Sequence, residues 1–246
     1  MRFSAVLALI GVGLVASPCA WASPAVSGEI AFDQGVLHSD GDNFYTDLGS
    51  GSLLLSFANP GFNLQADGSG GVLRAYGESA ELWAGALHGF WRDPKGAIGV
   101  SAGYGSMALG GESIRIGTYG AFGEWYARPD LTLRIKGGGL NVKDYGQTGG
   151  HVGAGAEYYI IPRLGISAEG EYASYSGQHF SSLGASIEFQ FWSKLPMTLS
   201  TGYQYTQNGG GSNTGTLMVH LRYLFGVSGA LVDLDRTGPL AWTGLI

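Results

Sequence analysis

Charged residues are scarce in this sequence. Asp, Glu, Lys and Arg make up 13% of the 246 residues, whereas they make up about 25% of a typical soluble protein. The chain is nevertheless too hydrophobic to be disordered, because disorder requires few apolar residues together with a high net charge. A low charge combined with 44 glycines and 13 tyrosines is not the composition of an ordinary soluble enzyme.

Long apolar runs and basic residues are also lacking. After residue 22, no stretch reaches the roughly 18 consecutive apolar residues that a transmembrane helix needs. The whole chain has 13 Lys and Arg against 19 Asp and Glu, and without Arg2 the balance is 12 to 19, a net charge near −7. This acidic balance argues against nucleic acid as a partner.

Cysteine is almost absent. The single cysteine, Cys19, lies in a segment with the three parts of an export signal. Arg2 supplies the positive charge, residues 3–16 are apolar, and residues 20–22 (AWA) form a small-x-small cleavage site. Because the Ser-Pro pair before Cys19 is a poor context for lipid attachment, we expect a signal peptide over residues 1–22 and a mature chain that starts at Ser23. Such a chain has no disulfide and no thiol chemistry.

Proline is uncommon but regularly spaced. Six of the eight prolines lie 33 to 36 residues apart, at Pro24, Pro60, Pro94, Pro129, Pro162 and Pro196. A fixed spacing of this size indicates a repeated structural unit. Helical repeats share this period, so the pattern inside each unit has to decide between helix and strand.

Inside each unit the residues alternate between apolar and polar. Residues 131–136 place Leu131, Leu133 and Ile135 on one face and Thr132, Arg134 and Lys136 on the other. Residues 151–160 alternate in the same way, after the polar, Gly-rich stretch KDYGQTGG. Alternation with a period of two is typical of β-strands that separate two environments. Each unit is therefore predicted to contain a strand, a long loop, a second strand and a short proline turn.

The alternation predicts a barrel of about twelve strands. Six units of two strands give twelve, with ten as the alternative. Three segments are weak: residues 27–36 alternate poorly, residues 81–91 place Glu81 and His88 on opposite faces, and residues 114–126 are ambiguous near Arg115, where a bulge is one explanation. We expect a single all-β domain over residues 23–225, an antiparallel up-and-down β-barrel, followed by a tail over residues 226–246.

The polar faces of the strands suit a confined interior better than a water-exposed surface. A soluble barrel exposes a face that is roughly 25–35% charged, but here the polar faces are mostly Gly, Ser, Ala and Thr. Arg134, Lys136 and Arg222 all fall on this face, and a Lys or Arg on the opposite face would cost about 2–4 kcal/mol at the centre of a bilayer. The apolar faces are therefore predicted to contact lipid.

The aromatic residues are predicted to form two rings at opposite ends of the strands. One set lies beside the proline turns: Phe57, Phe62, Phe90, Trp91, Trp125, Tyr126, Tyr158, Phe189, Phe191 and Phe225. A second set lies nearer the predicted long loops: Tyr104, Tyr119, Tyr172, Tyr203 and Tyr205. Two aromatic rings match the two interfaces of a bilayer, and short turns opposite long loops are the arrangement of outer-membrane barrels.

The alternation, the proline turns and the "RYLF" end resemble Gram-negative outer-membrane β-barrel proteins of the small porin-like type. The resemblance covers about residues 27–225, and residues 86–100 (ALHGFWRDPKGAIGV) are similar to a segment that recurs in this family. It implies that the last strand carries the signal read by the barrel-assembly machinery, here Leu217, Val219, Leu221, Tyr223 and Phe225. Members of the family usually stop at the aromatic residue, whereas this chain continues to Ile246.

The polar face supplies the first candidate site. The expected lumen-lining charged residues are Arg134, Lys136, Arg222, His220, Glu124, Glu157, Glu169, Glu171 and Glu188, together with Glu81. They are either a salt-bridged interior that fixes the strand register or the wall of a pore whose charges set ion selectivity. The excess of acid would favour cations weakly.

Two further candidate sites are less specific. Asp40, Asp42, Asn43 and Asp47 have oxygen ligands suited to Ca²⁺, but their spacing is that of an ordinary acidic loop. His151 and His179 lie near Ser174, Ser176 and Ser181, as a rim hydrolase would require, without a motif that connects them. The Gly-rich stretch of residues 209–215 lacks the Lys of a phosphate-binding loop, and no cofactor is expected.

These observations predict an integral outer-membrane barrel rather than an enzyme. The first hypothesis is a porin-like passive channel for small solutes or ions, the second a closed-lumen structural or surface-interaction barrel, and the third an outer-membrane hydrolase. Both termini are expected in the periplasm, and the expected partners are outer-membrane lipid, lipopolysaccharide and the assembly machinery. The tail is either flexible or folded back to plug the lumen.

Overall fold

The computed structural model describes residues 24–39, 42–57, 60–75, 78–109, 112–192, 195–209, 211 and 213–240. The predicted signal peptide and Cys19 lie outside these residues. In the described part of the chain, no helix is long and apolar enough to cross a membrane.

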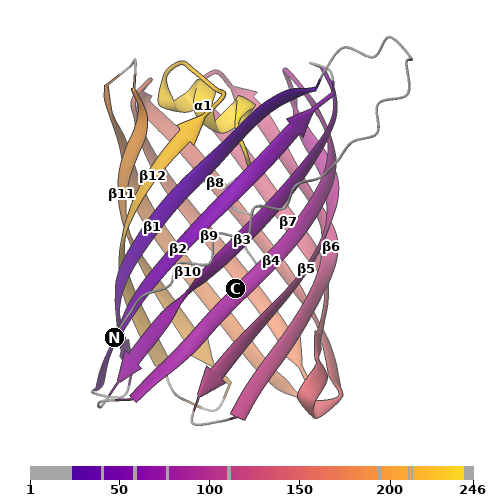
Figure 1. Ribbon diagram of the computed structural model, residues 1–246, viewed down its shortest axis with the longest axis vertical. Coiled ribbons are helices and arrows are strands. Elements are labelled where there is room, and N and C mark those ends of the chain that lie inside the picture. Colours follow the sequence, from indigo (N-terminus) through magenta and orange to yellow (C-terminus); the bar gives the residue numbers. More distant parts are fainter. Residues whose placement is uncertain are drawn as a thin grey trace, which may run out of the picture.

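Twelve antiparallel strands form a closed barrel in which each strand pairs with its neighbours in sequence and β1 pairs with β12 (Figure 1). The prediction of an up-and-down barrel of about twelve strands is confirmed. The strands are β1 (Ala25–Ser39), β2 (Asp42–Ser56), β3 (Gly61–Ala75), β4 (Glu78–Asp93), β5 (Gly96–Leu109), β6 (Glu112–Arg128), β7 (Leu131–Val142), β8 (Gln147–Ile161), β9 (Leu164–Tyr175), β10 (Gln178–Trp192), β11 (Leu195–Asn208) and β12 (Asn213–Phe225). A 3₁₀ turn, η1 (Lys143–Tyr145), and one helix, α1 (Leu231–Thr237), complete the described elements.

The two ends of the barrel can be told apart by their connections. Pro60, Pro94, Pro129 and Pro162 lie between strands at the end where β1 begins and β12 stops, here called the proline end. At the opposite end, the far end, β7 connects to β8 through η1 and Gly146, and β9 to β10 through residues 176–177. Because the Gly-rich stretches continue the strand ladders as far as residues 142 and 147, the expected long loops are replaced by longer strands and short connections.

The outer face of the barrel is apolar. Ile98, Leu87 and Leu183 remain 66–69% exposed, and a soluble protein rarely leaves such a continuous apolar surface bare. On β12 the predicted assembly residues Leu217, Val219, Leu221 and Tyr223 are all exposed, whereas Arg222 and Leu224 are buried on the inner face. The two faces predicted from alternation are therefore the outside and the inside of the barrel.

Several residues differ from their predicted positions. Glu81 is on the outer face with Trp83, because both have the parity opposite to the buried Ala80 and Ala86. No bulge occurs beside Arg115, since the ladder with β5 is continuous there and the irregular register of β6 lies between Trp125 and Arg128.

Two aromatic residues expected in the ring beside the proline turns point into the barrel. Phe90 is 1% exposed, and Tyr126 contacts the inward carboxylate of Glu124 through its hydroxyl. Their neighbours Trp91 and Trp125 take the outward positions, as the alternation of a strand requires.

Candidate functional site

The interior of the barrel holds two arginine-centred clusters, and the first is built on Arg134. Its Nε lies 3.2 Å from Glu124 Oε1 on β6, and its Nη2 lies 2.5 Å from Glu157 Oε2 on β8. The backbone pairing of Glu124 with Arg134 places these side chains side by side on neighbouring strands. A guanidinium held by two carboxylates satisfies its donors without exposing a charge to an apolar surface.

The second cluster is built on Arg222, whose side chain is only 2% exposed. Its Nε lies 2.7 Å from Glu188 Oε1 on β10 and 3.0 Å from Thr198 Oγ1, and its Nη1 lies 3.3 Å from Glu29 Oε2 on β1. Because β1 and β12 are the strands that close the barrel, this arginine connects the two sides of the closing seam. Nearby, His220 pairs with Asp33 of β1.

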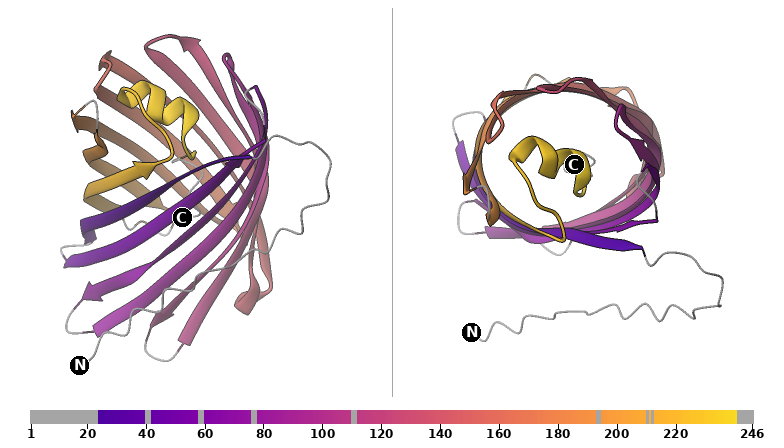
Figure 2. Two further views of the ribbon diagram at one scale, coloured as in Figure 1. Left: turned by 45° about the horizontal axis from the view of Figure 1, so that its top comes forward. Right: turned by 90° about the horizontal axis from the view of Figure 1, so that it is seen from above.

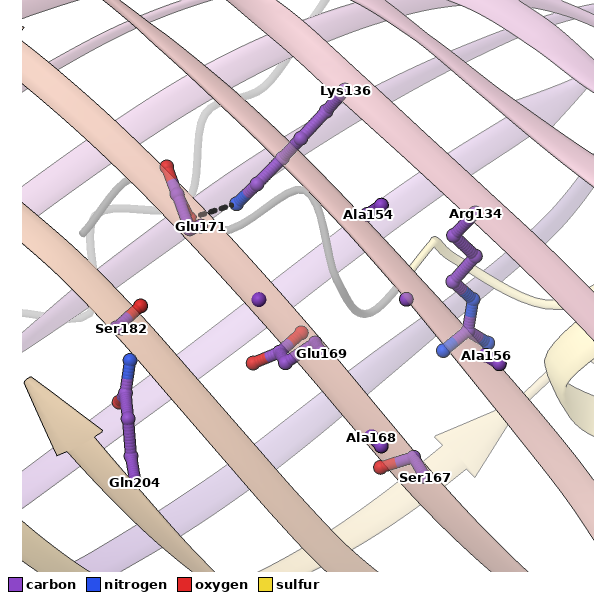
Figure 3. Close-up of a pocket in the computed structure, with 12 residues that line it drawn as sticks. Arg134, Lys136, Ala154, Ala156, Ser167, Ala168, Glu169, Glu171, Ser182 and Gln204 are labelled. Atoms are coloured by element: carbon purple, nitrogen blue, oxygen red, sulfur yellow. Dashed lines mark ion pairs between the residues drawn. The ribbon is translucent and has the colours of Figure 1, made fainter.

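The remaining predicted lumen residues line a pocket in the wall of β7 to β11 (Figure 3). Lys136 Nζ lies 2.8 Å from Glu171 Oε2, and His151 Nδ1 lies 3.3 Å from the other oxygen of that carboxylate. Glu169 points into the same pocket (Figure 3) and has no ion-pair partner among the described residues. The polar side chains of Ser167, Ser182 and Gln204 line the same pocket.

The chain re-enters the barrel after β12. Gly226 has a φ of 74°, and a Cβ there would lie 2.2 Å from the carbonyl oxygen of Val26, so only glycine fits this turn. The following helix α1 lies inside the ring of strands when the barrel is viewed along its length (Figure 2). Of the two alternatives for the tail, its described part adopts the second and occupies the lumen.

Local sequence explains the form of this segment. The Asp233 carboxylate accepts a 3.1 Å hydrogen bond from the backbone N–H of Ala230, which satisfies a free donor at the helix start. The helix ends at Thr237 because Gly238 and Pro239 follow, and proline disfavours the helical conformation in the residue before it. Leu231, Leu234 and Asp235 on one side of the helix are buried. The segment Gly229–Leu240 is called the plug below.

Ion pairs and hydrogen bonds attach the plug to several strands. Asp235 forms an ion pair with Arg222 and accepts a 3.1 Å hydrogen bond from the Tyr159 hydroxyl. Burial raises the pKa of the Asp235 carboxyl, against the opposing effect of Arg222. Arg236 donates to the carbonyl oxygens of Arg128, at 2.8 Å, and Leu131, at 3.2 Å. The plug is thus fixed at the proline end of the lumen.

An apolar patch on the inner wall receives the end of the plug. Leu54, Phe90, Ala97 and Phe122, from four different strands, form one buried cluster with Leu240. An apolar patch exposed to a charged lumen would be unfavourable, because apolar surface is stabilised by removal from water. Leu240 provides that cover.

Sequence reasoning missed this patch and the plug contacts. The available signal was parity: Phe90 and Phe122 share the polar face of their strands with His88 and Glu124. Apolar residues on an otherwise polar inner face, in a chain with a partly apolar tail, are a detectable pattern. The pairing of Asp235 with Arg222 has no such local signal.

The two less specific candidate sites gain no support from the geometry. Asp47 pairs with Arg74 at 2.6 Å and accepts from Gln34 on the outer face, while Asn43 contacts His38, and Asp40 lies outside the described residues. Within the described ranges, no group of three or more His, Cys, Asp or Glu side chains is arranged to hold a metal.

The histidines near the far end have partners other than serine. His179 Nδ1 lies 2.9 Å from the Tyr172 hydroxyl, and the only close polar partner of His151 among the described residues is Glu171. Neither His151 nor His179 therefore forms, with Ser174, Ser176 or Ser181, the nucleophile–base pair that a hydrolase needs.

Comparison with known proteins gives a likeness in fold. No protein-family model and no curated protein sequence matches this chain. Among solved structures, the COG4313 outer membrane channel from Pseudomonas putida F1 matches with a TM-score of 0.58, 11% identity, 85% of this chain and 100% of that chain covered. The KdgM porin matches with a TM-score of 0.51, 11% identity, and 78% and 98% covered.

A second structure of that porin, in complex with disordered oligogalacturonate, matches with a TM-score of 0.52, 11% identity, and 78% and 98% covered. Identities this low show the fold alone. The chain has the twelve-stranded fold of small porin-like outer-membrane barrels.

Proposed function

We propose that this protein is an outer-membrane channel of the porin type, which lets small hydrophilic solutes or ions pass passively and whose lumen is narrowed by its own plug. The observation that carries the proposal is the contrast between the two faces of the barrel wall. The outer face bears exposed Ile, Leu, Val and Trp side chains, and the inner face bears ion pairs, hydroxyls and the carboxylate of Glu169.

This contrast supports a membrane setting with a hydrated interior. Lipid cannot hydrogen-bond to backbone groups, so a sheet that spans it must close on itself, and the β1–β12 pairing provides the closure. Membrane barrels of this kind have a polar interior behind an apolar outer band. Charged residues on the inner wall suit water and dissolved ions.

The orientation and partners belong to the same proposal. With the proline end towards the periplasm, both the start of β1 and the plug lie on that side, and the outer apolar face contacts outer-membrane lipid and lipopolysaccharide. The outward residues Leu217, Val219, Leu221, Tyr223 and Phe225 of β12 would serve the assembly machinery. The aromatic ring of Phe225 lies over Gly28 of β1, where an added Cβ would lie 2.2 Å from the ring. The proposed assembly signal therefore also covers the seam between β1 and β12.

The plug favours a second candidate function, a structural or surface-interaction barrel with a closed lumen. Its hydrogen bonds reach β3, β4, β8, β10 and β12, so it crosses much of the lumen. The two candidates differ in whether the folded, full-length protein conducts.

Single-channel recording in planar bilayers tests the proposal. The full-length protein, shown to be folded by its shift in gel mobility on heating, should produce discrete conductance steps that scale with salt concentration. A matched preparation denatured by boiling should give none. Absence of steps from the folded protein, including a variant whose plug is displaced, would reject the channel in favour of the closed barrel.

A further inference from the structure

The plug is recognised through its backbone as much as through its side chains. Gln190 Nε2 donates to the Gly229 carbonyl at 3.1 Å, and Arg92 Nη1 donates to the Gly238 carbonyl at 2.7 Å. Gln65 makes two bonds to Leu240: its Nε2 donates to the carbonyl at 3.2 Å, and its Oε1 accepts from the N–H at 2.8 Å. A pair of bonds to one residue's N–H and C=O imitates a strand neighbour, which is how extended peptides are held in binding sites.

Side-chain pockets add selectivity to this backbone recognition. Leu240 enters the patch formed by Leu54, Phe90, Ala97 and Phe122. Leu231 packs against Gly165 of β9, where an added Cβ would lie 3.5 Å from its Cδ2 atom. Backbone bonds for affinity and apolar pockets for specific side chains are the two parts of a peptide-recognition site.

The plug can leave without depriving Arg222 of its other carboxylate partners. If Asp235 departs, Arg222 keeps Glu188 at 2.7 Å and Glu29 at 3.3 Å, so the heavy cost of an uncompensated buried charge does not arise at Arg222. Departure does uncover the apolar patch and frees Arg92, whose Nε and Nη2 already lack hydrogen-bond partners in the described structure. The vacant wall would therefore retain affinity for a replacement of similar chemistry.

We propose that the inner wall at the proline end is a peptide-binding site, built from Gln65, Arg92, Gln190, Arg222 and the apolar patch, with the plug as its exchangeable resident ligand. Its ligand class is a short peptide with leucines at the spacing of residues 231, 234 and 240, an aspartate for Arg222 and a Gly-Pro step before the last leucine. Binding stands independently of the proposed channel, whereas its effect, a smaller opening when the site is occupied, rests on it.

Peptide binding in trans is the direct test. The full-length chain carrying Leu234→Asp and Leu240→Asp retains its tail but loses two of the three buried leucines of the plug. A fluorescent peptide with the sequence of residues 227–240 should bind this variant saturably, measured by anisotropy in detergent micelles. Wild type should bind it at least about 10-fold more weakly, because its own tail competes at an effective concentration of roughly millimolar.

Matched controls separate recognition from non-specific adsorption. The same peptide with Leu240→Asp should not bind, and adding Gln65→Ala to the wall of the double variant should weaken binding. Ser182→Ala, which lies in the lumen without touching the plug, should leave it unchanged. Failure of the folded double variant to bind the peptide, or equal binding by the altered peptide, would overturn the site.

Conductance distinguishes this inference from the channel itself. If the double variant conducts and the peptide lowers its conductance, both proposals stand. If the variant binds the peptide but never conducts, the peptide-binding site stands and the channel proposal is rejected. If it conducts but does not bind the peptide, the channel proposal stands and the peptide-binding site is rejected. Peptide binding that leaves conductance unchanged would reject the effect of occupancy on the opening.

If the double variant does not fold, a cysteine pair tests whether the plug leaves its site. Gly165→Cys with Leu231→Cys would join the plug to β9, and the only natural cysteine, Cys19, lies in the segment predicted to be removed. Locked by oxidation, the channel should stay in its low-conductance state, and reduction should restore larger openings. Identical records before and after reduction would show that the plug does not exchange.

Discussion

Arg222 of β12 and Asp235 of α1 form an ion pair across the turn that carries the chain from the barrel wall into the lumen. The same guanidinium also holds Glu29 of β1 and Glu188 of β10. One side chain therefore connects the closing seam, a neighbouring part of the wall and the plug.

Replacing Arg222 with methionine should strongly destabilise the barrel. The change leaves the carboxylates of Glu29, Glu188 and Asp235 without their cation, and removal of one partner from a buried ion pair typically costs about 3–5 kcal/mol. Urea unfolding in lipid vesicles, followed by tryptophan fluorescence, measures the loss. Arg115→Met is the control. Its pair with Asp144 lies at the far end, where the Arg115 side chain is half exposed, and exposed ion pairs contribute much less to stability than buried ones. Similar losses in both variants would contradict the central role of Arg222.

Leu234→Ala should loosen the plug while leaving the barrel intact. Leu234 is fully buried, and truncation of a buried leucine costs about 2–5 kcal/mol. Hydrogen exchange should therefore show faster exchange of the amides of α1, with unchanged protection in the strands. Val232→Ala, at a half-buried position on the same helix, should have a smaller effect. Loss of protection throughout the strands would show that the plug is part of the barrel's cooperative unit.

Arginine should be tolerated inside the barrel and rejected outside it. Ile187 and Ser186 are adjacent on β10 but face outward and inward respectively, and the Ser186 hydroxyl lies 2.7 Å from the hydroxyl of Ser167 on the neighbouring strand β9. Ile187→Arg should cost about 2–4 kcal/mol in a bilayer, as outward arginines do near the midplane. Ser186→Arg should cost much less, because Glu188 and Glu169 line the same interior. Equal costs in vesicle unfolding experiments would contradict the assignment of the two faces.

Glu169→Gln should reduce any preference of the channel for cations. The Glu169 carboxylate faces the lumen pocket and forms no ion pair within the described residues, so we expect its charge to act on passing ions. The reversal potential in a salt gradient measures the preference. Glu81→Gln removes the same charge from the outer face and should leave the reversal potential unchanged. An equal shift in both variants would remove Glu169 from the conduction path.

The Arg115–Asp144 pair predicts a small, signed effect of pH at the far end. Hydrogen bonds from Arg115 lower the pKa of the Asp144 carboxyl below its usual value, so the folded state binds that proton more weakly than the unfolded state. The pair's contribution is therefore present above the ordinary aspartate pKa of about 3.9 and disappears as the pH falls through the lowered value. Melting of wild type and Asp144→Asn should differ at neutral pH and converge in acid. If the melting temperatures of wild type and Asp144→Asn moved further apart on acidification, the Arg115–Asp144 pair would not be the cause of the pH effect.

Alternation was sufficient to predict the barrel. The side chains of a strand must alternate between its two faces, so odd and even positions of residues 217–225 lie on opposite faces. Arg222 lies on the face opposite to Leu221 and Tyr223, and its charge identifies that face as the inside. Strand length was less predictable. Gly149 and Gly150 look like loop residues, yet they continue the ladder of β8 against Tyr175 and Ser174, where neighbouring strands supply the backbone hydrogen bonds that a glycine-rich segment does not secure alone.

The plug could be anticipated only as an alternative. Its contacts join residues far apart in sequence, such as Gln65 with Leu240 and Tyr159 with Asp235, and periodicity contains no information about such pairs. The inward Phe90 and Phe122 would have favoured docking over a flexible tail, had their parity been compared with that of His88 and Glu124.

The position of Arg222 at the seam has a consequence for the order of assembly. Glu29 belongs to the first strand and Arg222 to the last, so the cradle for Asp235 exists only after the two ends of the sheet have met. The segment that follows β12 would then dock only after the wall has closed, so a docked plug implies a closed barrel.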